Sequence, residues 1–178
     1  MMANETLFAE TQRFKQKWLW ALLIAMAVFI PGPTLLGLIR QIFYGQQFGN
    51  NPLSNNGLII LTIVNVILPI IPLVLFAYMK LETIIKDDGI YVRFLPFQLK
   101  FKYYGWSNLS QCYIRQYSPV NEYGGWGLRG FGKNKALNVS GNIGLQLETK
   151  DGNRLLIGTN QPQEVENILR KLKQYRSQ

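Results

Sequence analysis

The sequence contains no histidine and a single cysteine, Cys112, among its 178 residues. Without histidine there is no imidazole for general acid–base catalysis, for a Ser-His-Asp or Cys-His nucleophile system, or for metal binding. One cysteine excludes an intrachain disulfide framework and a cysteine cluster for zinc. We therefore expect no metal, no cofactor and no catalytic residue, and we expect that the protein is not an enzyme.

Charge is also scarce, at 16% of residues, and it is unevenly distributed. Between Trp18 and Met79 the only charged residue is Arg40. Two apolar stretches, 18–39 and 57–79, are each long enough to cross a hydrocarbon core of roughly 30 Å as a helix. Neither shows the polar face typical of a helix in a soluble protein. We expect two transmembrane helices joined by an external loop, 40–56.

The first apolar stretch contains Pro31 and Pro33, which cannot donate helical hydrogen bonds. Either this helix kinks there, or it ends near Ile30 and a short interfacial helix runs from Pro33 to Phe43. A cleaved signal peptide is disfavoured, because 17 residues precede the apolar run and a second span follows it.

One strongly polar side chain, Asn65, lies deep in the second stretch. Pro69, four residues later, frees the Asn65 carbonyl, and Pro31 and Pro33 free carbonyls at a similar depth of the first span. We expect Asn65, Pro69, Pro31 and Pro33 to contribute intramembrane packing through an amide–carbonyl bond.

Lysine and arginine flank the apolar pair on one side only. Arg13, Lys15 and Lys17 precede it, Lys80 and Lys86 follow it, and the loop carries only Arg40. This distribution predicts a multi-pass protein of the plasma (inner) membrane. Its N-terminal segment, 1–17, and its C-terminal domain, 80–178, would both be cytoplasmic.

The pattern changes after residue 80 to short alternating segments separated by turns, which predicts about seven antiparallel strands in a sandwich or barrel. In the turn Asp87-Asp88-Gly89 we expect the glycine to have positive φ. The chain ends in an amphipathic helix whose apolar stripe includes Val165, Leu169 and Tyr175. The predicted strands are 81–86, 90–95, 99–105, 111–117, 136–140, 144–149 and 154–158.

Three stretches carry a family resemblance: residues 89–97, residues 123–129 with the run Tyr-Gly-Gly-Trp-Gly-Leu-Arg, and residues 155–159 before a Gln-Pro-Gln-Glu helix start. With Trp106 between them, they resemble the bacterial membrane-anchored PH-like proteins. These have two transmembrane helices followed by a PH-like domain and are largely of unknown function. The resemblance implies a membrane helical hairpin and a PH-like barrel closed by a C-terminal helix. It implies no activity.

Two glycine-rich matches do not predict a nucleotide site. Residues 125–130 fit a dinucleotide motif as text, and 127–134 come close to a P-loop. No helix N-terminus is expected after either to hold phosphate. Residues 80–178 carry 15 Lys/Arg and 8 Asp/Glu, a net of +7. We expect anionic lipid headgroups rather than nucleic acid to attract this basic domain, and Asp87 and Asp88 argue against inositol phosphate.

The connection 117–133 is long for a hairpin loop and rich in aromatic residues and arginine, which are typical of binding hot spots. We consider three roles for it: core packing of Trp126 and Phe131 on a sixth strand, contact with lipid headgroups, and a protein-partner surface of Tyr123, Trp126, Arg129 and Phe131. The expected function is a membrane-tethered scaffold or docking module. The alternatives are a subunit of a larger transport complex and a small membrane-bound enzyme.

The expected topology can be tested by cysteine labelling of intact cells. A cysteine introduced at Ser54 should react with an impermeant maleimide from outside, because the loop is external. One at Gln178 should react only after permeabilisation. The reverse pattern would contradict the orientation.

Overall fold

The computed structural model describes residues 5–176, which form two compact units. One unit is helical and comprises Lys15–Tyr78. The other is a β domain that combines the residues before Lys15 with those from Met79 onward. The N-terminal segment therefore belongs to the same unit as the C-terminal domain, although sequence analysis treated the two as separate.

The helical unit consists of α1 (Lys17–Phe29), α2 (Gly32–Tyr44) and α3 (Asn55–Tyr78). Both α1 and α2 pack against α3. Two helical stretches, Lys17–Tyr44 and Asn55–Tyr78, are long and apolar enough to cross a membrane. Their windows of highest hydropathy are only 22% and 17% buried, whereas a core helix of a soluble protein is mostly buried. Apolar side chains thus cover most of their outer surface.

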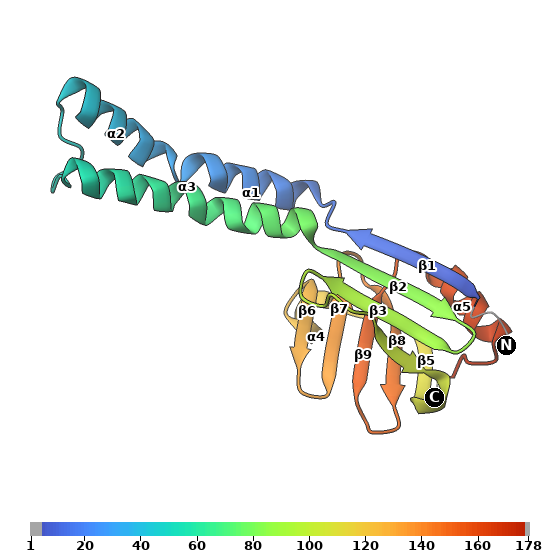
Figure 1. The fold of residues 1–178 in the computed structure, drawn as a ribbon. Helices are drawn as coiled ribbons and strands as arrows, with labels where there is room; N and C mark the ends of the chain where they lie inside the picture. Colours follow the sequence, from blue (N-terminus) through green and yellow to red (C-terminus); the bar gives the residue numbers. More distant parts are fainter. Residues whose placement is uncertain (1–4, 177–178) are drawn as a thin grey trace. The chain divides into compact units, whose positions relative to one another are not determined.

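The first stretch is interrupted at Ile30–Pro31 and resumes at once (Figure 1). Pro33 lies in the first turn of α2, where a missing N–H costs nothing. The break is therefore local, and helical structure continues to Tyr44. The loop is correspondingly shorter than expected, and Gln41 holds it by donating to the Leu53 carbonyl at 2.9 Å and accepting from the Phe48 N–H.

Asn65 does bond to the first helical stretch, but its partner differs from the expected carbonyl. Its amide lies 3.5 Å from the hydroxyl of Thr34, which itself donates to the Pro31 carbonyl at 3.0 Å. Thr62 adds a second contact, to the Thr34 carbonyl at 3.4 Å. Pro69 is buried in α3. The polar contact between the helices is thus centred on Thr34, which sequence analysis did not single out.

The β domain contains two sheets. The first has the order β1-β2-β3-β4 and is antiparallel throughout. Its strands are β1 (Thr6–Arg13), β2 (Lys80–Lys86), β3 (Gly89–Leu95) and β4 (Lys102–Gly105). The second has the order β5-β8-β9-β7-β6 and is mixed, because β7 pairs with β9 in parallel. Its strands are β5 (Leu109–Gln116), β6 (Gly127–Phe131), β7 (Asn134–Asn138), β8 (Ile143–Thr149) and β9 (Arg154–Gly158).

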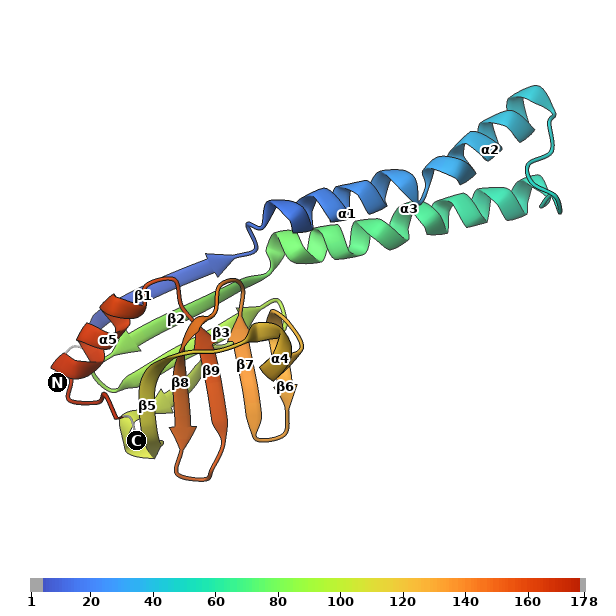
Figure 2. The same ribbon diagram turned by 180° about the vertical axis from the view of Figure 1, so that it is seen from behind.

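The described residues thus form nine strands rather than about seven, and the second sheet is not a simple meander. The core lies between the sheets, where alternate residues of β2 and β3 such as Leu81, Ile85 and Phe94 are fully buried. Leu145 and Leu147 of β8 are buried likewise. The helix α5 (Pro162–Lys171) packs against β1, β5 and β8 (Figure 2).

Two local expectations need correction. Gly89 does not adopt positive φ; a Cβ there would lie 2.5 Å from the Tyr104 carbonyl oxygen, so the close approach of β4 requires glycine. The terminal helix ends at Lys171, so Tyr175 lies beyond it. The backbone of Arg176 instead exchanges two hydrogen bonds with Cys112 and covers the outer edge of β5.

Strand β1 places two polar side chains on the buried face of the first sheet. Its register sets Glu10 opposite Thr83 and Gln12 opposite Leu81, on the same face as the core residues of β2. The Glu10 carboxylate accepts from the Thr159 hydroxyl at 2.7 Å and the Asn160 N–H at 2.9 Å. The Gln12 amide donates to the Gly158 carbonyl at 2.6 Å. These bonds join the N-terminal strand β1 to the end of β9 and to the two residues that follow it.

We predict that Glu10→Ala lowers the stability of the β domain. The substitution leaves the buried Thr159 hydroxyl and the part-buried Asn160 N–H without their acceptor, a loss of about 1–3 kcal/mol. Thermal unfolding of the full-length protein in detergent, followed by tryptophan fluorescence, measures it. Glu5→Ala, at an exposed position before β1, is the control. Equal unfolding temperatures for the two variants would show that the buried contacts of Glu10 contribute nothing.

We predict that Asn65→Leu weakens helix packing by about 0.6 kcal/mol, and by up to roughly 2, without preventing insertion. The reason is the lost contact to Thr34. Titration of the purified protein with a denaturing detergent, monitored by circular dichroism, gives the difference. Ile63→Leu, on an exposed side of α3, should be silent. Greater resistance of Asn65→Leu than of wild type would contradict the packing role.

Candidate interaction surface

The segment 117–133 is ordered structure rather than an irregular connection. It contains the short helix α4 (Pro119–Tyr123) and the whole of β6. Gly124, with φ 72°, ends α4, and Gly132, with φ 60°, forms the tight β6–β7 turn. These are backbone conformations that other residues rarely adopt. The apparent excess of loop therefore reflects a helix that the pattern did not reveal and a strand that had been only one of the alternatives.

The helix α4 covers the face of the second sheet that is turned away from the core between the sheets. Strand register places Ala136 of β7 and Leu156 of β9 side by side on this face. They form a small buried cluster with Tyr117 and Tyr123, whose rings meet edge to face at 6.1 Å. Tyr123 is thus a packing residue and is not exposed to a partner, contrary to its place in the predicted surface.

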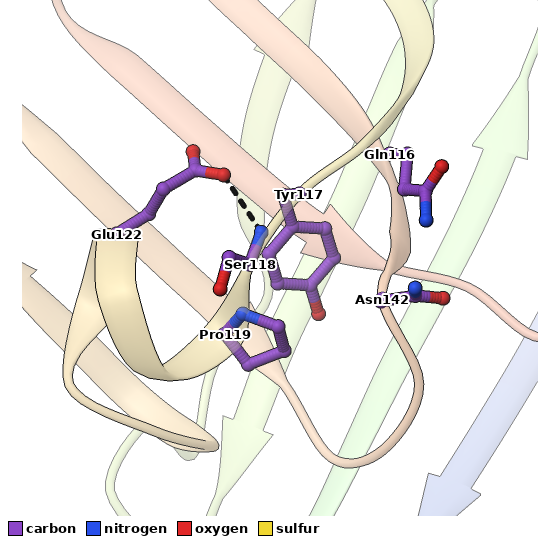
Figure 3. A pocket seen from close by; sticks show the side chains of 6 residues that line it. All are labelled: Gln116, Tyr117, Ser118, Pro119, Glu122 and Asn142. Carbon is purple, nitrogen blue, oxygen red and sulfur yellow. Dashed lines mark hydrogen bonds between the residues drawn. The ribbon is translucent and has the colours of Figure 1, made fainter.

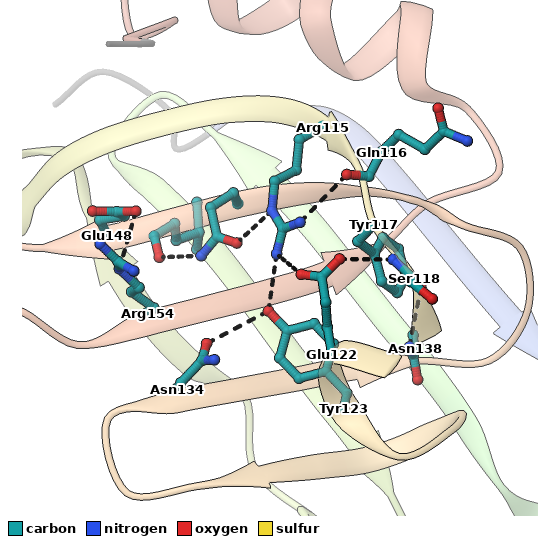
Figure 4. A network of polar contacts seen from close by, with 12 residues as sticks. Arg115, Gln116, Tyr117, Ser118, Glu122, Tyr123, Asn134, Asn138, Glu148 and Arg154 are labelled. Atoms are coloured by element: carbon teal, nitrogen blue, oxygen red, sulfur yellow. Dashed lines mark hydrogen bonds and ion pairs between the residues drawn. The ribbon is translucent and has the colours of Figure 1, made fainter. Parts of the chain in front are cut away.

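Arg115 organises the polar side of this cluster (Figure 4). Its guanidinium pairs with the Glu122 carboxylate at 2.8 Å and donates to the Tyr123 hydroxyl at 3.1 Å. It also donates to the Gln146 side-chain oxygen at 3.0 Å. Glu122 in turn accepts from the Ser118 N–H at 2.7 Å. One arginine from β5 therefore holds the C-terminal residues of α4 on the sheet, and Glu122 links them to Ser118, directly before the helix.

Asn138, at the end of β7, is a second buried hub. Its side-chain oxygen accepts from the Gly127 N–H at 2.8 Å, and its amide donates to the Tyr117 hydroxyl at 3.0 Å. It is fully buried. These bonds fix where β6 begins and hold Tyr117, which lies two residues before the start of α4. Neither Asn138 nor Arg115 had a sequence signal, because a polar residue in a strand is ordinarily expected to face water.

The electrostatics of the network follow from these bonds. The hydrogen bond from Arg115 lowers the pKa of Glu122, with help from the Ser118 N–H and against the effect of burial. Burial opposes the charged form of Arg115, but Glu122 and Tyr123 outweigh it, so the pKa of Arg115 is raised. Burial also raises the pKa of Tyr117 and of Tyr123. Glu122 is accordingly held as a carboxylate and Tyr123 as a neutral phenol.

A shallow open pocket of about 520 Å³ lies beside α4 (Figure 3). Its lining is Gln116, Tyr117, Ser118, Pro119, Glu122 and Asn142. The Glu122 carboxylate is engaged by Arg115 and by the Ser118 N–H. In residues 5–176 no group of three or more acidic or cysteine side chains could hold a metal ion. The pocket thus offers hydrogen-bonding groups, and its one carboxylate already neutralises an arginine.

The remaining residues of the predicted surface differ in exposure. Trp126 is half-buried, and its indole N–H donates to the Gly141 carbonyl at 3.1 Å. Arg129 is exposed and donates to the Trp126 carbonyl at 2.9 Å. Phe131, at the end of β6, is 95% exposed, so the structure gives it no core role. The structure therefore separates the predicted surface into a packing residue, Tyr123, and a neighbouring exposed group on β6.

The exposed residues of the β6–β7 hairpin are basic or apolar. Strand register places Arg129 and Phe131 on the same face of the hairpin as Ala136, and Leu128 and Lys135 on the opposite face. Leu128 of β6 is 42% exposed, and Lys133 and Lys135 are exposed in the turn and on β7. Strand β6 is the last strand of its sheet, and no described strand pairs with its outer edge. We call Leu128, Arg129, Phe131, Lys133 and Lys135 the β6 strip.

Comparison with known proteins gives no assignment: no protein-family model matches this chain, and no curated protein is significantly similar to it.

The Arg115–Glu122 pair predicts a specific pH dependence. Because the pKa of Glu122 is lowered from 4.5 in the folded protein, the ion pair stabilises the fold above about pH 4.5. This contribution is lost as the pH falls below 4.5 toward the folded-state pKa. Glu122→Gln should lower stability at pH 7 by about 0.2–1 kcal/mol, the range for a partly exposed pair.

Thermal unfolding at pH 7 and at pH 3.5 measures this effect. The difference between wild type and Glu122→Gln should shrink at the lower pH. The exposed residue Glu164 provides the matched control, Glu164→Gln. A difference that is unchanged or larger at pH 3.5 would show that Glu122 does not act through its charge.

Proposed function

We propose that this protein is a non-enzymatic docking module, tethered to the membrane by its two long apolar helices. In this proposal both helices cross the plasma (inner) membrane, and the β domain lies at the cytoplasmic face. The lysine and arginine residues that flank the helical unit support that orientation. The large exposed apolar surface of the helices supports their insertion.

The β domain is proposed to be PH-like. Two sheets with the core between them and a helix after the last strand support this assignment. The added strand β1 and the parallel pairing of β7 with β9 are departures from a simple PH-like meander.

The observation that carries the docking proposal is the β6 strip. An edge strand has unpaired backbone groups to which an extended segment can add as another strand. Phe131 gives such a segment an apolar contact, and three of the five strip residues are cationic. Residues 124–147 contain no aspartate or glutamate. The proposed partner is therefore a protein with an extended, carboxylate-bearing segment.

Rigidity of the strip favours binding, because little conformational entropy remains to be lost. The turn is closed by Gly132, and the start of β6 is fixed by Asn138. The network of Arg115 holds α4, which immediately precedes the strand. These internal contacts give the otherwise buried polar residues a role in presenting the surface.

Site-specific photocrosslinking in native membranes tests this function. A photoreactive side chain at position 131 should give a discrete protein adduct. Position 151, in the exposed turn of the neighbouring β8–β9 hairpin, is the matched control and should give none. Arg129→Glu with Lys133→Glu should abolish the adduct by repelling carboxylates. If no adduct forms at 131, or if it survives charge reversal, the proposed docking surface is wrong.

A further inference from the structure

The connection between β3 and β4 exposes two large apolar side chains. Phe97 is 55% exposed and Leu99 is 72% exposed, in a loop that extends from Pro96 to Phe101. They are separated by one residue and followed directly by the exposed Lys100. We call residues 96–101 the β3–β4 loop.

Contacts within the domain hold this loop in place. The Gln98 N–H donates to the Phe94 carbonyl at 2.8 Å, and the Arg93 guanidinium donates to the Leu99 carbonyl at 3.1 Å. The Phe97 ring stacks on the buried Phe94 ring at 6.3 Å. Arg93 also lies over the Phe101 ring, 4.3 Å from its centre. The loop is therefore held in one conformation by the domain. Its apolar side chains nevertheless remain exposed.

Strand register locates the loop at the end of the first sheet from which the chain enters the helical unit. Arg13 of β1 is opposite Lys80 of β2, and Lys80 is opposite Leu95 of β3. Neighbouring strands lie about 4.8 Å apart, so Leu95 is roughly 10 Å across the sheet from Arg13. Only three residues separate Arg13 from Lys17, where α1 begins, and Lys80 follows Tyr78, where α3 ends, by two positions.

The charges around the loop are mainly positive. Arg13, Lys100 and Lys102 are exposed. The nearby Glu82 is paired with both Lys80, at 2.6 Å, and Arg93, so its negative charge is offset locally. Phenylalanine and leucine beside lysine are typical of segments that lie in the interface of an anionic bilayer.

We propose that the β3–β4 loop is a third membrane attachment, which places Phe97 and Leu99 among the headgroups of an anionic bilayer. This inference rests on the proposed crossing of the membrane by the helices, because that crossing brings residues 13 and 80 to the bilayer surface. Each lysine near the surface contributes about 1 kcal/mol of attraction. Together with the two covalent connections, the loop would restrict the tilt of the β domain and so the direction in which the β6 strip faces.

Fluorescence quenching of the full-length protein in lipid nanodiscs tests this proposal. Phe97→Cys, Leu99→Cys and the control Asp151→Cys are each labelled with an environment-sensitive dye. Native Cys112 should not react, because it is buried and its pKa is raised to about 12. Lipids with a nitroxide near the headgroup should quench the dye at 97 and 99 severalfold more than at 151. Lys100→Gln with Lys102→Gln should reduce that quenching in anionic nanodiscs only.

Several outcomes would overturn the inference. Quenching at 97 and 99 no greater than at 151 would show that the loop does not reach the lipid. If the dye at 97 and 99 changes its fluorescence only when another protein is added, the loop binds a protein partner instead of lipid. Extraction of the chain from membranes by alkaline carbonate separates the two proposals, since a released chain would refute membrane crossing itself. An integrated chain with an unquenched loop would refute only the loop attachment.

Discussion

The pairing of β1 with β2 is the constraint on which the rest of the β domain depends. These strands flank the helical unit in sequence, so their seven paired positions between Thr6 and Arg13 close a loop of more than sixty residues into one ladder. The entropy of closing so long a loop is unfavourable, and the helical unit recovers part of it by forming a compact hairpin of its own. Glu10 and Gln12 then anchor β1 to the far end of the domain sequence through Gly158, Thr159 and Asn160.

Two regions of the domain carry apolar side chains that do not contribute to its core. The core is filled by residues that include those of β2, β3, β8 and β9, and Arg115 and Asn138 of the second sheet form hydrogen bonds or ion pairs with α4 and with the segment that leads to it. The large apolar side chains that remain exposed include Leu128 and Phe131 at the β6–β7 hairpin and Phe97 and Leu99 in the β3–β4 loop, besides Tyr103 of β4 and Val120 of α4. Exposure of such side chains on braced elements is costly for a soluble protein and is typical of surfaces that contact something else.

Sequence patterns predicted the elements whose periodicity is undisguised. They predicted the two apolar helical stretches, the strands β2, β3, β8 and β9, and the apolar stripe on α5 that contains Val165 and Leu169. Strand β1 was missed because two of the four residues on its buried side are polar. These residues are Phe8, Glu10, Gln12 and Phe14, so hydrophobicity does not show the period of two that is typical of a strand. Strand β6 was considered only as one of three roles for segment 117–133 and was not among the predicted strands, because two glycines and an arginine lower its apparent strand propensity. Tyr123 was misplaced because its burial depends on the helix α4, which the pattern did not reveal, and on the hydrogen bond from Arg115.

The central claim is that residues before the first helix form part of the β domain. Hydrogen exchange of the full-length protein in nanodiscs tests it directly, since amides in a stable ladder open far more slowly than those of a free segment. The account predicts that amides of 8–13 that bond to β2 are protected to the same degree as those of 80–86. Rapid exchange throughout 8–13, alongside a protected 80–86, would contradict it.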